Sequence, residues 1–210
     1  MRARRVLGAA GLATLGAALW WRKNPSACPY GQRLWVELPH PVVTRDRLRE
    51  VLAPEVGERV LEIGPGTGYY TLDMAEWLVP GSADSGEGGT VEIFDLQEEF
   101  LDHVMTRAAE RGLANVVPTQ GDATALPYDD TSIDAVVLTA VLGEIPDPAA
   151  ALREIRRVLK PSGRLIVGEL FGDPHFTTQS SLKRQAAGAG LHYETHSGNW
   201  FAYFARLSPA

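Results

Sequence analysis

Three glycines occupy alternate positions in the stretch EIGPGTG, residues 62–68, directly after the apolar run ERVLEI. Gly64, Gly66 and Gly68 carry no Cβ, so the backbone can turn sharply there and approach a ligand closely. Glycine-rich loops between a strand and a helix often hold phosphates, and the dinucleotide fingerprint has the spacing G-x-G-x-x-G. Here the third glycine comes one residue early, and the loop contains no lysine or arginine. We therefore predict a binding loop for a ligand without phosphate, with a purely structural strand-to-helix turn as the alternative.

Three carboxylates accompany the loop, each in or after a predicted strand. Glu62 lies just before the glycines, where it can anchor the N–H groups of the loop or face an ammonium group. Asp95 ends the run TVEIFD, where a carboxylate can accept hydrogen bonds from a ribose diol. Asp122 follows NVVPTQ, where it can bond an adenine amino group while Ala123 and Leu126 pack on the ring. The structural alternatives are a loop-stabilising carboxylate for Glu62, a helix-end carboxylate for Asp95 and a turn aspartate for Asp122.

A repeating order of elements would bring these groups together. Apolar runs that predict strands cover residues 58–63, 90–96, 115–120, 135–141 and 164–170. Amphipathic stretches that predict helices cover residues 44–53, 69–78, 97–112, 146–163 and 177–190. The five strands lack polar alternation, which is typical of a parallel sheet covered by helices on both faces. Two final runs flank the dipeptide GN and predict an antiparallel hairpin.

The predicted fold class is therefore α/β, with a doubly wound and mostly parallel sheet that ends in an antiparallel C-terminal hairpin. Ligands of such sheets bind outside the carboxyl ends of the strands, where the strand order reverses. Helix signals support the boundaries: Thr44 can cap the first helix and Pro54 stops it. Asp147 can cap the helix that begins near Pro148, and the segment 161–163 should end it.

Bulk composition excludes several other classes of protein. The chain has 210 residues, 45% of them hydrophobic, which suits one domain with a sizeable core. Its net charge of −6 does not favour a nucleic-acid partner, because backbone binding needs a clustered basic surface. Cys28 is the only cysteine, so an internal disulfide is excluded. The histidines do not pair at metal-ligand spacing, and we expect no structural metal.

The N-terminal end differs from the rest of the chain. An uncharged apolar run covers residues 6–21 and ends in Trp20 and Trp21, followed by Arg22 and Lys23. As a helix it would be about 24 Å long, short for a hydrocarbon core of about 30 Å. We predict a membrane anchor over residues 1–24, spanning or partly inserted, and an aromatic linker or lid over residues 25–43. A cleaved export signal and a soluble extension are the alternatives.

Four stretches in order carry a family resemblance: VLEIGPGTGYY, IFDLQ, GDATALPYDDTSIDAVV and EIPDPAAALREIRRVLKPSGRLIV. Together they resemble the class I S-adenosylmethionine-dependent methyltransferases, in the small-molecule group that includes the ubiquinone/menaquinone methyltransferases. The resemblance covers about residues 44–207 and implies a catalytic domain over residues 44–210. It implies a Rossmann-like methyltransferase fold, a seven-stranded sheet with an antiparallel last strand, and S-adenosylmethionine as the cofactor.

The resemblance also implies which residues hold the cofactor. In the family, the glycine-rich loop lies against the methionine part of the cofactor, an acidic residue binds the ribose and an apolar neighbour packs on the adenine. Further contacts are made at the adenine edge and at the floor of the reaction site. The matching positions here are Glu62, Gly64, Pro65, Gly66 and Gly68 for the loop, Asp95 for the ribose, Leu96 for the adenine, Asp122 and Ala123 for the adenine edge, and Thr139 and Ala140 for the floor.

Catalytic groups are less clearly marked. Methyl transfer from a sulfonium loses charge, so a general base is needed only where the nucleophile must lose a proton. Related enzymes often carry a histidine before IPDP, where this chain has Gly143 and Glu144. Glu144, His40 and His175 are the candidates, each with an ordinary loop residue as its alternative. Tyr30 and Trp35 are expected to pack on the domain, with the lining of an apolar acceptor pocket as the alternative.

The predicted function is methyl transfer from S-adenosylmethionine to a small, apolar or lipid-like acceptor. The alternatives are a non-catalytic S-adenosylmethionine-binding regulator and an NAD-dependent oxidoreductase. The cofactor is made in the cytosol, so we expect a membrane-associated protein with a cytoplasmic catalytic domain. Arg2, Arg4 and Arg5 before the apolar run outnumber the two cations after it, which favours the opposite orientation for a spanning helix. A run that lies in the interface resolves this conflict.

Overall fold

A computed structural model describes residues 25–33, 42–79 and 88–210. The predicted membrane anchor, Trp35, His40 and the middle of the predicted linker lie outside the described residues. Among the described helices, none has the length and apolar character required to cross a bilayer.

The described residues form one seven-stranded sheet with the strand order β3-β2-β1-β4-β5-β7-β6. The strands are β1 (Arg59–Ile63), β2 (Thr90–Asp95), β3 (Val116–Gln120), β4 (Ile133–Thr139), β5 (Leu159–Leu170), β6 (Leu191–Gly198) and β7 (Ala202–Pro209). The first five are parallel, and β7 pairs antiparallel with both β5 and β6. The strand order reverses between β1 and β4, as a doubly wound sheet requires, and the predicted fold class is confirmed.

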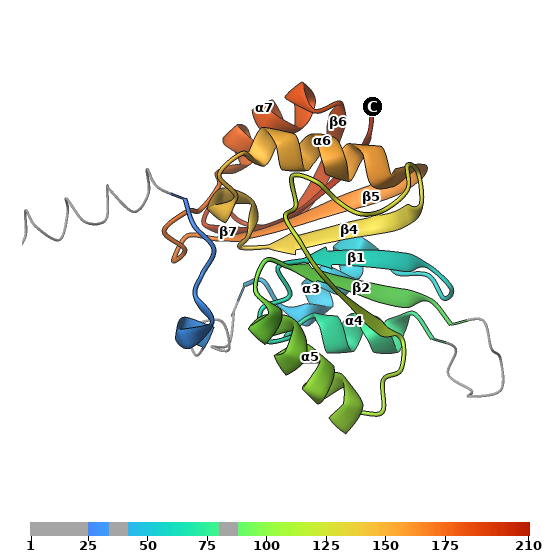
Figure 1. Cartoon of the computed structure of the whole chain (residues 1–210). Helices are drawn as coiled ribbons and strands as arrows, with labels where there is room; N and C mark the ends of the chain where they lie inside the picture. Colours follow the sequence, from blue (N-terminus) through green and yellow to red (C-terminus); the bar gives the residue numbers. More distant parts are fainter. Residues whose placement is uncertain (1–24, 34–41, 80–87) are drawn as a thin grey trace, which may run out of the picture.

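Helices cover both faces of the sheet (Figure 1). They are α3 (Arg45–Leu52), α4 (Thr71–Trp77), α5 (Glu98–Glu110), α6 (Pro148–Val158) and α7 (Gln179–Gly188), with the short 3-10 helices η1 (Tyr30–Gln32) and η2 (Leu142–Glu144). α3, α4 and α5 lie on one face and α6 and α7 on the other. Each face has its own apolar core, because the buried strands present side chains to both layers.

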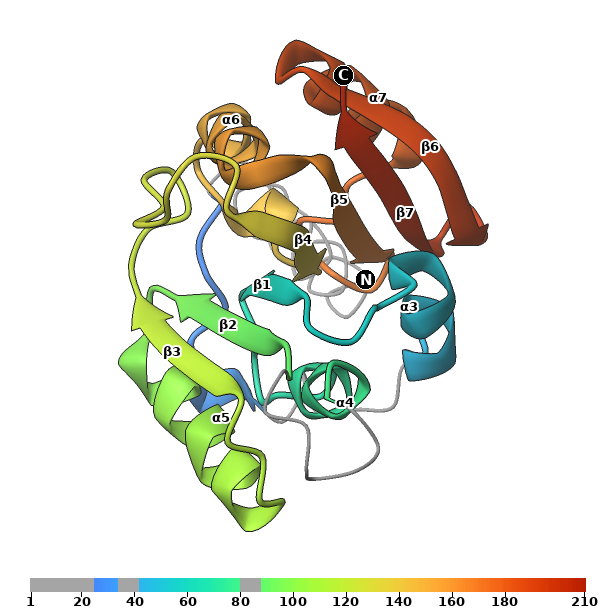
Figure 2. The same cartoon turned by 90° about the vertical axis from the view of Figure 1, so that its right-hand side faces the viewer.

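Local sequence explains most helix boundaries. Thr44 accepts a hydrogen bond from the Arg47 N–H at the start of α3, and Asp147 accepts one from Ala150 at the start of α6. Both predicted caps are confirmed. α3 ends at Leu52, followed by Ala53 in a left-handed conformation, and in Figure 2 the helix lies beside β7.

The predicted end of α6 was wrong by several residues. The helix ends at Val158 and β5 begins at once with Leu159, so the segment expected to stop the helix already belongs to the strand. Pro161 cannot donate to a helix and disfavours helical backbone at the residue before it, so the chain becomes extended early. The extra length pairs irregularly with β4, with a register shift between Ile133 and Ala135.

Candidate active site

A cavity of about 960 Å³ opens at the carboxyl ends of the parallel strands. It lies where the strand order reverses, between the loops that follow β1 and β4. Segments distant in sequence line it: the loop after β1, the ends of β2 and β3, and the loops after β4 and β5. Residues Pro25, Ser26, Ala27, Cys28 and Gln32 complete the lining from the N-terminal side. We call residues 25–33 the strap; in Figure 1 it is the blue segment along this edge.

The glycine loop turns as its composition predicts. Gly64, Gly66 and Gly68 all have positive φ values, of 70°, 54° and 80°. The Gly64 N–H donates to the Phe94 carbonyl oxygen at 2.8 Å, and a Cβ on Gly64 would stand 2.4 Å from a methyl group of Val141. A side chain at Gly64 would therefore clash with the Val141 side chain, and the left-handed backbone there disfavours one as well.

The three glycines differ in what they face. Gly64 and Gly66 line the cavity together with Pro65. Gly68 is not among the lining residues, and a Cβ there would stand 3.3 Å from the methyl groups of Val104 in α5. Its position in the structure is explained by its left-handed backbone and by helix packing.

Glu62 is the most deeply buried carboxylate of the lining, with 2% of its surface exposed. It accepts a hydrogen bond from the Thr71 hydroxyl at the start of α4. Burial raises the pKa of Glu62 to about 8, because a charge without a counter-charge is poorly solvated there. The carboxyl group is thus ready to ionise when a cation enters the cavity.

Asp95 and Asp122 line the same cavity in different environments. Asp95 accepts a hydrogen bond from the Gln97 N–H at 2.8 Å, and burial raises its pKa. Asp122 is exposed and accepts hydrogen bonds from both the N–H and the hydroxyl of Thr124 at 2.8 Å, which lower its pKa. Asp122 therefore stabilises a turn and also faces the cavity.

Apolar groups lie beside these carboxylates. Leu96, 53% exposed, and the buried Ala123 both line the cavity. Their positions next to Asp95 and Asp122 suit the two faces and the edge of a flat ring. The predicted grouping of these four residues in one cavity agrees with the structure.

The floor lies at the end of β4. The hydroxyl of Thr139 is buried and has no hydrogen-bond partner among the described residues. Ala140 has a φ of 56°, rare for a residue with a Cβ, while its N–H donates to the Gly168 carbonyl at 2.8 Å. A strained residue beside an unpaired hydroxyl is typical of a functional site.

Glu144 and His175 face the cavity from the loops after β4 and β5. Glu144 accepts a hydrogen bond from the Cys28 N–H of the strap at 3.1 Å. Burial, and then the charges of Asp173 and Asp95, raise the pKa of Glu144 to about 8. The backbones of the two loops lie in contact at Gly143. A Cβ added to Gly143 would stand 1.9 Å from the His175 carbonyl oxygen.

The polar groups of the site that were not predicted include Asp173 and Gln97. Asp173 lines the cavity, and burial raises its pKa, while it accepts a hydrogen bond from the His175 N–H at 2.6 Å. Gln97 lines it as well and bonds to the strap. The signal for Asp173 was its place after the fifth strand, at the edge where ligands bind. Tyr30 packs against Phe100 with ring centroids 5.1 Å apart and does not line the cavity, as expected.

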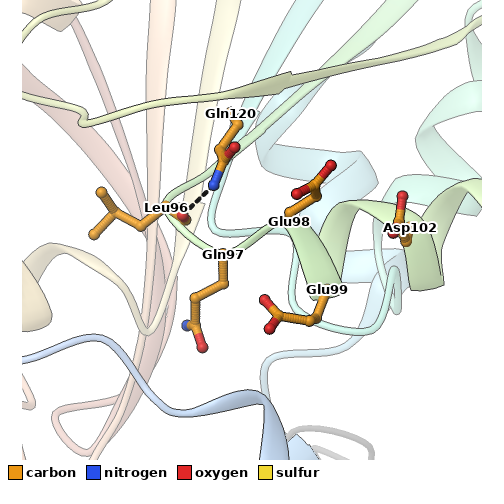
Figure 3. Close-up of a pocket in the computed structure, with 6 residues that line it drawn as sticks. All are labelled: Leu96, Gln97, Glu98, Glu99, Asp102 and Gln120. Carbon is orange, nitrogen blue, oxygen red and sulfur yellow. Dashed lines mark hydrogen bonds between the residues drawn. The ribbon is translucent and has the colours of Figure 1, made fainter.

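A smaller hollow of about 390 Å³ lies beside the loop after β2 (Figure 3). It is lined by Leu96, Gln97, Glu98, Glu99, Asp102 and Gln120. The Gln120 amide donates to the Leu96 carbonyl oxygen at 3.0 Å and supports this loop from outside. No group of described residues has the arrangement of a metal site.

The chemistry of the large cavity fits S-adenosylmethionine. Its described lining contains the carboxyl groups of Glu62, Asp95, Asp122, Glu144 and Asp173 and no lysine or arginine. That set suits a ligand that carries a sulfonium and an ammonium group and lacks phosphate. The unpaired Thr139 hydroxyl and the glycine backbone of Gly64 and Gly66 in the lining add to the fit.

Comparison with known proteins agrees with this chemistry. The profile described as "Methyltransferase domain" matches residues 54–196. The chain belongs to this methyltransferase family. The predicted family and cofactor, S-adenosylmethionine, are confirmed, and the NAD-dependent oxidoreductase alternative does not agree with the match.

Two relatives illustrate the sequence similarity. The ubiquinone/menaquinone biosynthesis C-methyltransferase UbiE of Cellvibrio japonicus is 35% identical over 127 residues, which are 60% of this chain and 48% of the relative. UbiE of Teredinibacter turnerae is 33% identical over 152 residues, 72% of this chain and 54% of the relative. The matched region thus spans about half the length of these relatives.

A solved structure shows the shared fold. The S-adenosylmethionine-dependent methyltransferase from Aquifex aeolicus superimposes with a TM-score of 0.77 at 17% identity, covering 88% of this chain and all of the other. At this identity the likeness shows the fold alone. It confirms the predicted Rossmann-like methyltransferase fold, including the antiparallel C-terminal strands.

Proposed function

We propose that this methyltransferase transfers the methyl group of S-adenosylmethionine to an aromatic carbon of an uncharged, quinol-like acceptor. The relatives at 33–35% identity are named for C-methylation in quinone biosynthesis, which supports this acceptor class. The observation that carries the proposal is the cavity at the strand ends, with five carboxyl groups and a glycine-rich wall. Bound there, S-adenosylmethionine supplies an electrophilic methyl group.

Charge argues for a neutral acceptor. Among the described lining residues, carboxyl groups have no lysine or arginine beside them. An anionic acceptor would be repelled by those carboxyl groups that are ionised, and it would find no lysine or arginine in the described lining to offset that repulsion. A quinol carries no charge until one hydroxyl loses its proton, and its ring can pack on the apolar lining residues Val141, Ile145 and Leu170.

Glu144 is the group of this chain best placed to accept that proton. Its carboxyl group faces the cavity from η2, beside the apolar lining. With a pKa of about 8 it is a stronger base than an ordinary glutamate, which suits removal of a phenolic proton. Loss of the hydroxyl proton makes the ring carbon electron-rich and so a better nucleophile. The Cys28 N–H orients one carboxyl oxygen.

A membrane surface is the proposed source of the acceptor. The apolar run 6–21 precedes the strap, and the strap lines the cavity. Phe171 follows the lining residue Leu170 at the end of β5, and Trp200 and Phe201 lie in the turn between β6 and β7. The three are 61%, 73% and 37% exposed, and the Trp200 ring contacts both phenylalanine rings. Exposed aromatic rings of this kind favour a bilayer interface. The catalytic domain is proposed to face the cytoplasm, where the cofactor is made.

Vesicle flotation tests the membrane proposal. Trp200→Ser should lower recovery with neutral lipid vesicles, whereas Val56→Ser, which changes another exposed apolar residue, should not. Equal recovery of both variants and the unsubstituted protein would argue against a role for this aromatic surface.

Methyl transfer itself is tested with cofactor labelled in the methyl group. The purified protein is incubated with reduced benzoquinols and naphthoquinols that have one unsubstituted ring position, and with their O-methylated forms. We expect label in the organic phase only with the free quinols, on ring carbon. Tight S-adenosylhomocysteine binding without transfer to any quinol would instead favour a non-catalytic cofactor-binding regulator.

A further inference from the structure

The strap is held against two sides of the cavity. On one side its Cys28 N–H donates to Glu144 after β4. On the other side the Tyr30 ring packs edge-on against Phe100 of α5, and the Tyr30 hydroxyl lies 3.3 Å from Nδ1 of His103. Pro25 to Cys28 and Gln32 line the cavity beside these contacts, so the strap covers part of it.

Gln97 makes the most specific contact with the strap. Its side-chain Nε2 donates to the Cys28 carbonyl oxygen at 2.9 Å, and its Oε1 accepts from the Tyr30 N–H at 3.1 Å. One amide group thus pairs with two backbone groups of the strap, much as a neighbouring strand would. In Figure 3 the Gln97 side chain points toward the blue ribbon of the strap.

The position of Gln97 makes this contact informative. Gln97 is the N-cap residue of α5, where serine, threonine, aspartate and asparagine are preferred because their short side chains accept hydrogen bonds from the helix N–H groups. The Gln97 side chain makes no such bond. A residue that leaves its helix uncapped and instead binds another segment departs from the local rule, and such departures are expected at functional sites.

We propose that Gln97 is a positioning residue that holds the strap over the cofactor cavity, so that ligand exchange requires its two bonds to Cys28 and Tyr30 to break. Gln97 follows Asp95 and Leu96 directly, so it couples the predicted ribose and adenine contacts to the closed strap. The proposal rests on the proposed function only in assigning the cavity to the cofactor.

Cys28 provides a direct probe of strap opening. It is the only cysteine of the chain and lies half-buried between Gln97 and Glu144. The rate at which its thiol reacts with an aromatic disulfide reagent, at one fixed pH, therefore reports how often the strap opens. We expect Gln97→Ser to raise this rate about tenfold or more, the size expected for the loss of one or two ordinary hydrogen bonds.

The serine variant separates the proposed role from a structural one. Serine is a preferred N-cap, so the melting temperature should stay the same or rise while the strap is released. Gln120→Ser is the matched control, because Gln120 supports the same loop through Leu96 without touching the strap. Gln97→Glu retains the acceptor for Tyr30 and loses the donor to Cys28, so its labelling rate should be intermediate. An unchanged labelling rate in both Gln97 variants would overturn the proposal.

S-adenosylhomocysteine adds a second readout. It should slow Cys28 labelling in the unsubstituted protein, and it should dissociate about tenfold faster from Gln97→Ser than from Gln120→Ser. Equal dissociation rates would overturn the role in ligand exchange. A third outcome is faster labelling of Gln97→Ser together with no binding of S-adenosylhomocysteine. That result would support the contact between Gln97 and the strap, and it would refute the proposed function instead.

Discussion

Glu144 is the residue at which the strap, the loop after β4 and the proposed binding region of the acceptor meet. Its carboxyl group bonds to Cys28, and its pKa is raised to about 8 by burial and by the charges of Asp173 and Asp95. A base with this pKa becomes ionised as the pH rises through about 8. The proposed reaction should therefore accelerate over the same range.

Glu144→Gln tests this role. We expect kcat to fall about 100-fold or more, because the acceptor hydroxyl loses its base, while S-adenosylhomocysteine affinity should change little. The pH–rate profile of the unsubstituted enzyme should rise toward pH 8, and that of the variant should lose this rise. A variant with unchanged kcat would show that Glu144 serves only to hold the strap.

Glu62 should link cofactor binding to pH. Its pKa of about 8 leaves it mostly protonated at pH 7 before the cofactor binds, and an ammonium or sulfonium group nearby would favour the ionised form. Affinity should therefore increase with pH up to about 8, by at most about tenfold per unit, with release of a proton. Calorimetry in buffers of different ionisation heat measures that proton. Glu62→Gln should abolish it, and a proton release that persists in this variant would place the titrating group elsewhere.

At the scale of elements, the site depends on close contacts between loops. The loop after β1 approaches the loop after β4 at Gly64, and the loop after β4 approaches the loop after β5 at Gly143. These contacts place Glu144 and Asp173 in one cavity. A side chain at either glycine would separate the loops.

Gly143→Ala tests the second contact. The new Cβ would stand 1.9 Å from the His175 carbonyl oxygen, so the backbone must shift. We expect a loss of about 1–3 kcal/mol in the free energy of unfolding, together with weaker acceptor binding. The control is Gly188→Ala at the end of α7, where nothing lies within 4 Å of the added Cβ. It should be neutral or stabilising, so equal losses in the two variants would contradict the packing argument.

At the scale of the whole molecule, the fold buries carboxyl groups whose protonation affects its stability. Glu62 and Glu169 are 2% and 1% exposed, and burial raises the pKa of each to about 8. In the unfolded chain both would titrate near their ordinary value of about 4.3. The folded protein therefore holds more protons than the unfolded chain between about pH 4.5 and 8.

Stability without cofactor should accordingly fall as the pH rises through this range. The contribution of these two groups is fully present below about pH 4.5, and it is lost progressively as the pH rises toward about 8. Urea unfolding at pH 5, 6, 7 and 8 measures the slope. Glu62→Gln should make it shallower. Stability that increases steadily from pH 5 to 8 would contradict the proton uptake.

Most of the fold was predictable because it depends on local patterns. The apolar runs predicted the parallel strands, and the caps at Thr44 and Asp147 were correct. The end of α6 was not, because pairing of Leu159 with β4 and the backbone restriction imposed by Pro161 favour an extended chain there. Gln97 and Asp173 were missed because their sequence neighbours do not show which distant segment they face.

The sequence by itself determined the fold class, and its resemblance to a known family indicated the cofactor. Strand and helix periodicity, the G-x-G-x-G loop and the three carboxylates at predicted strand ends are local features, and parallel strands necessarily bring their carboxyl ends to one edge. Only the tertiary structure decided that the strap lies across that edge, that Glu144 meets it, and that burial raises the pKa of Glu62 and Glu144. These properties depend on contacts between residues far apart in the chain and on exclusion of water, which no local pattern specifies.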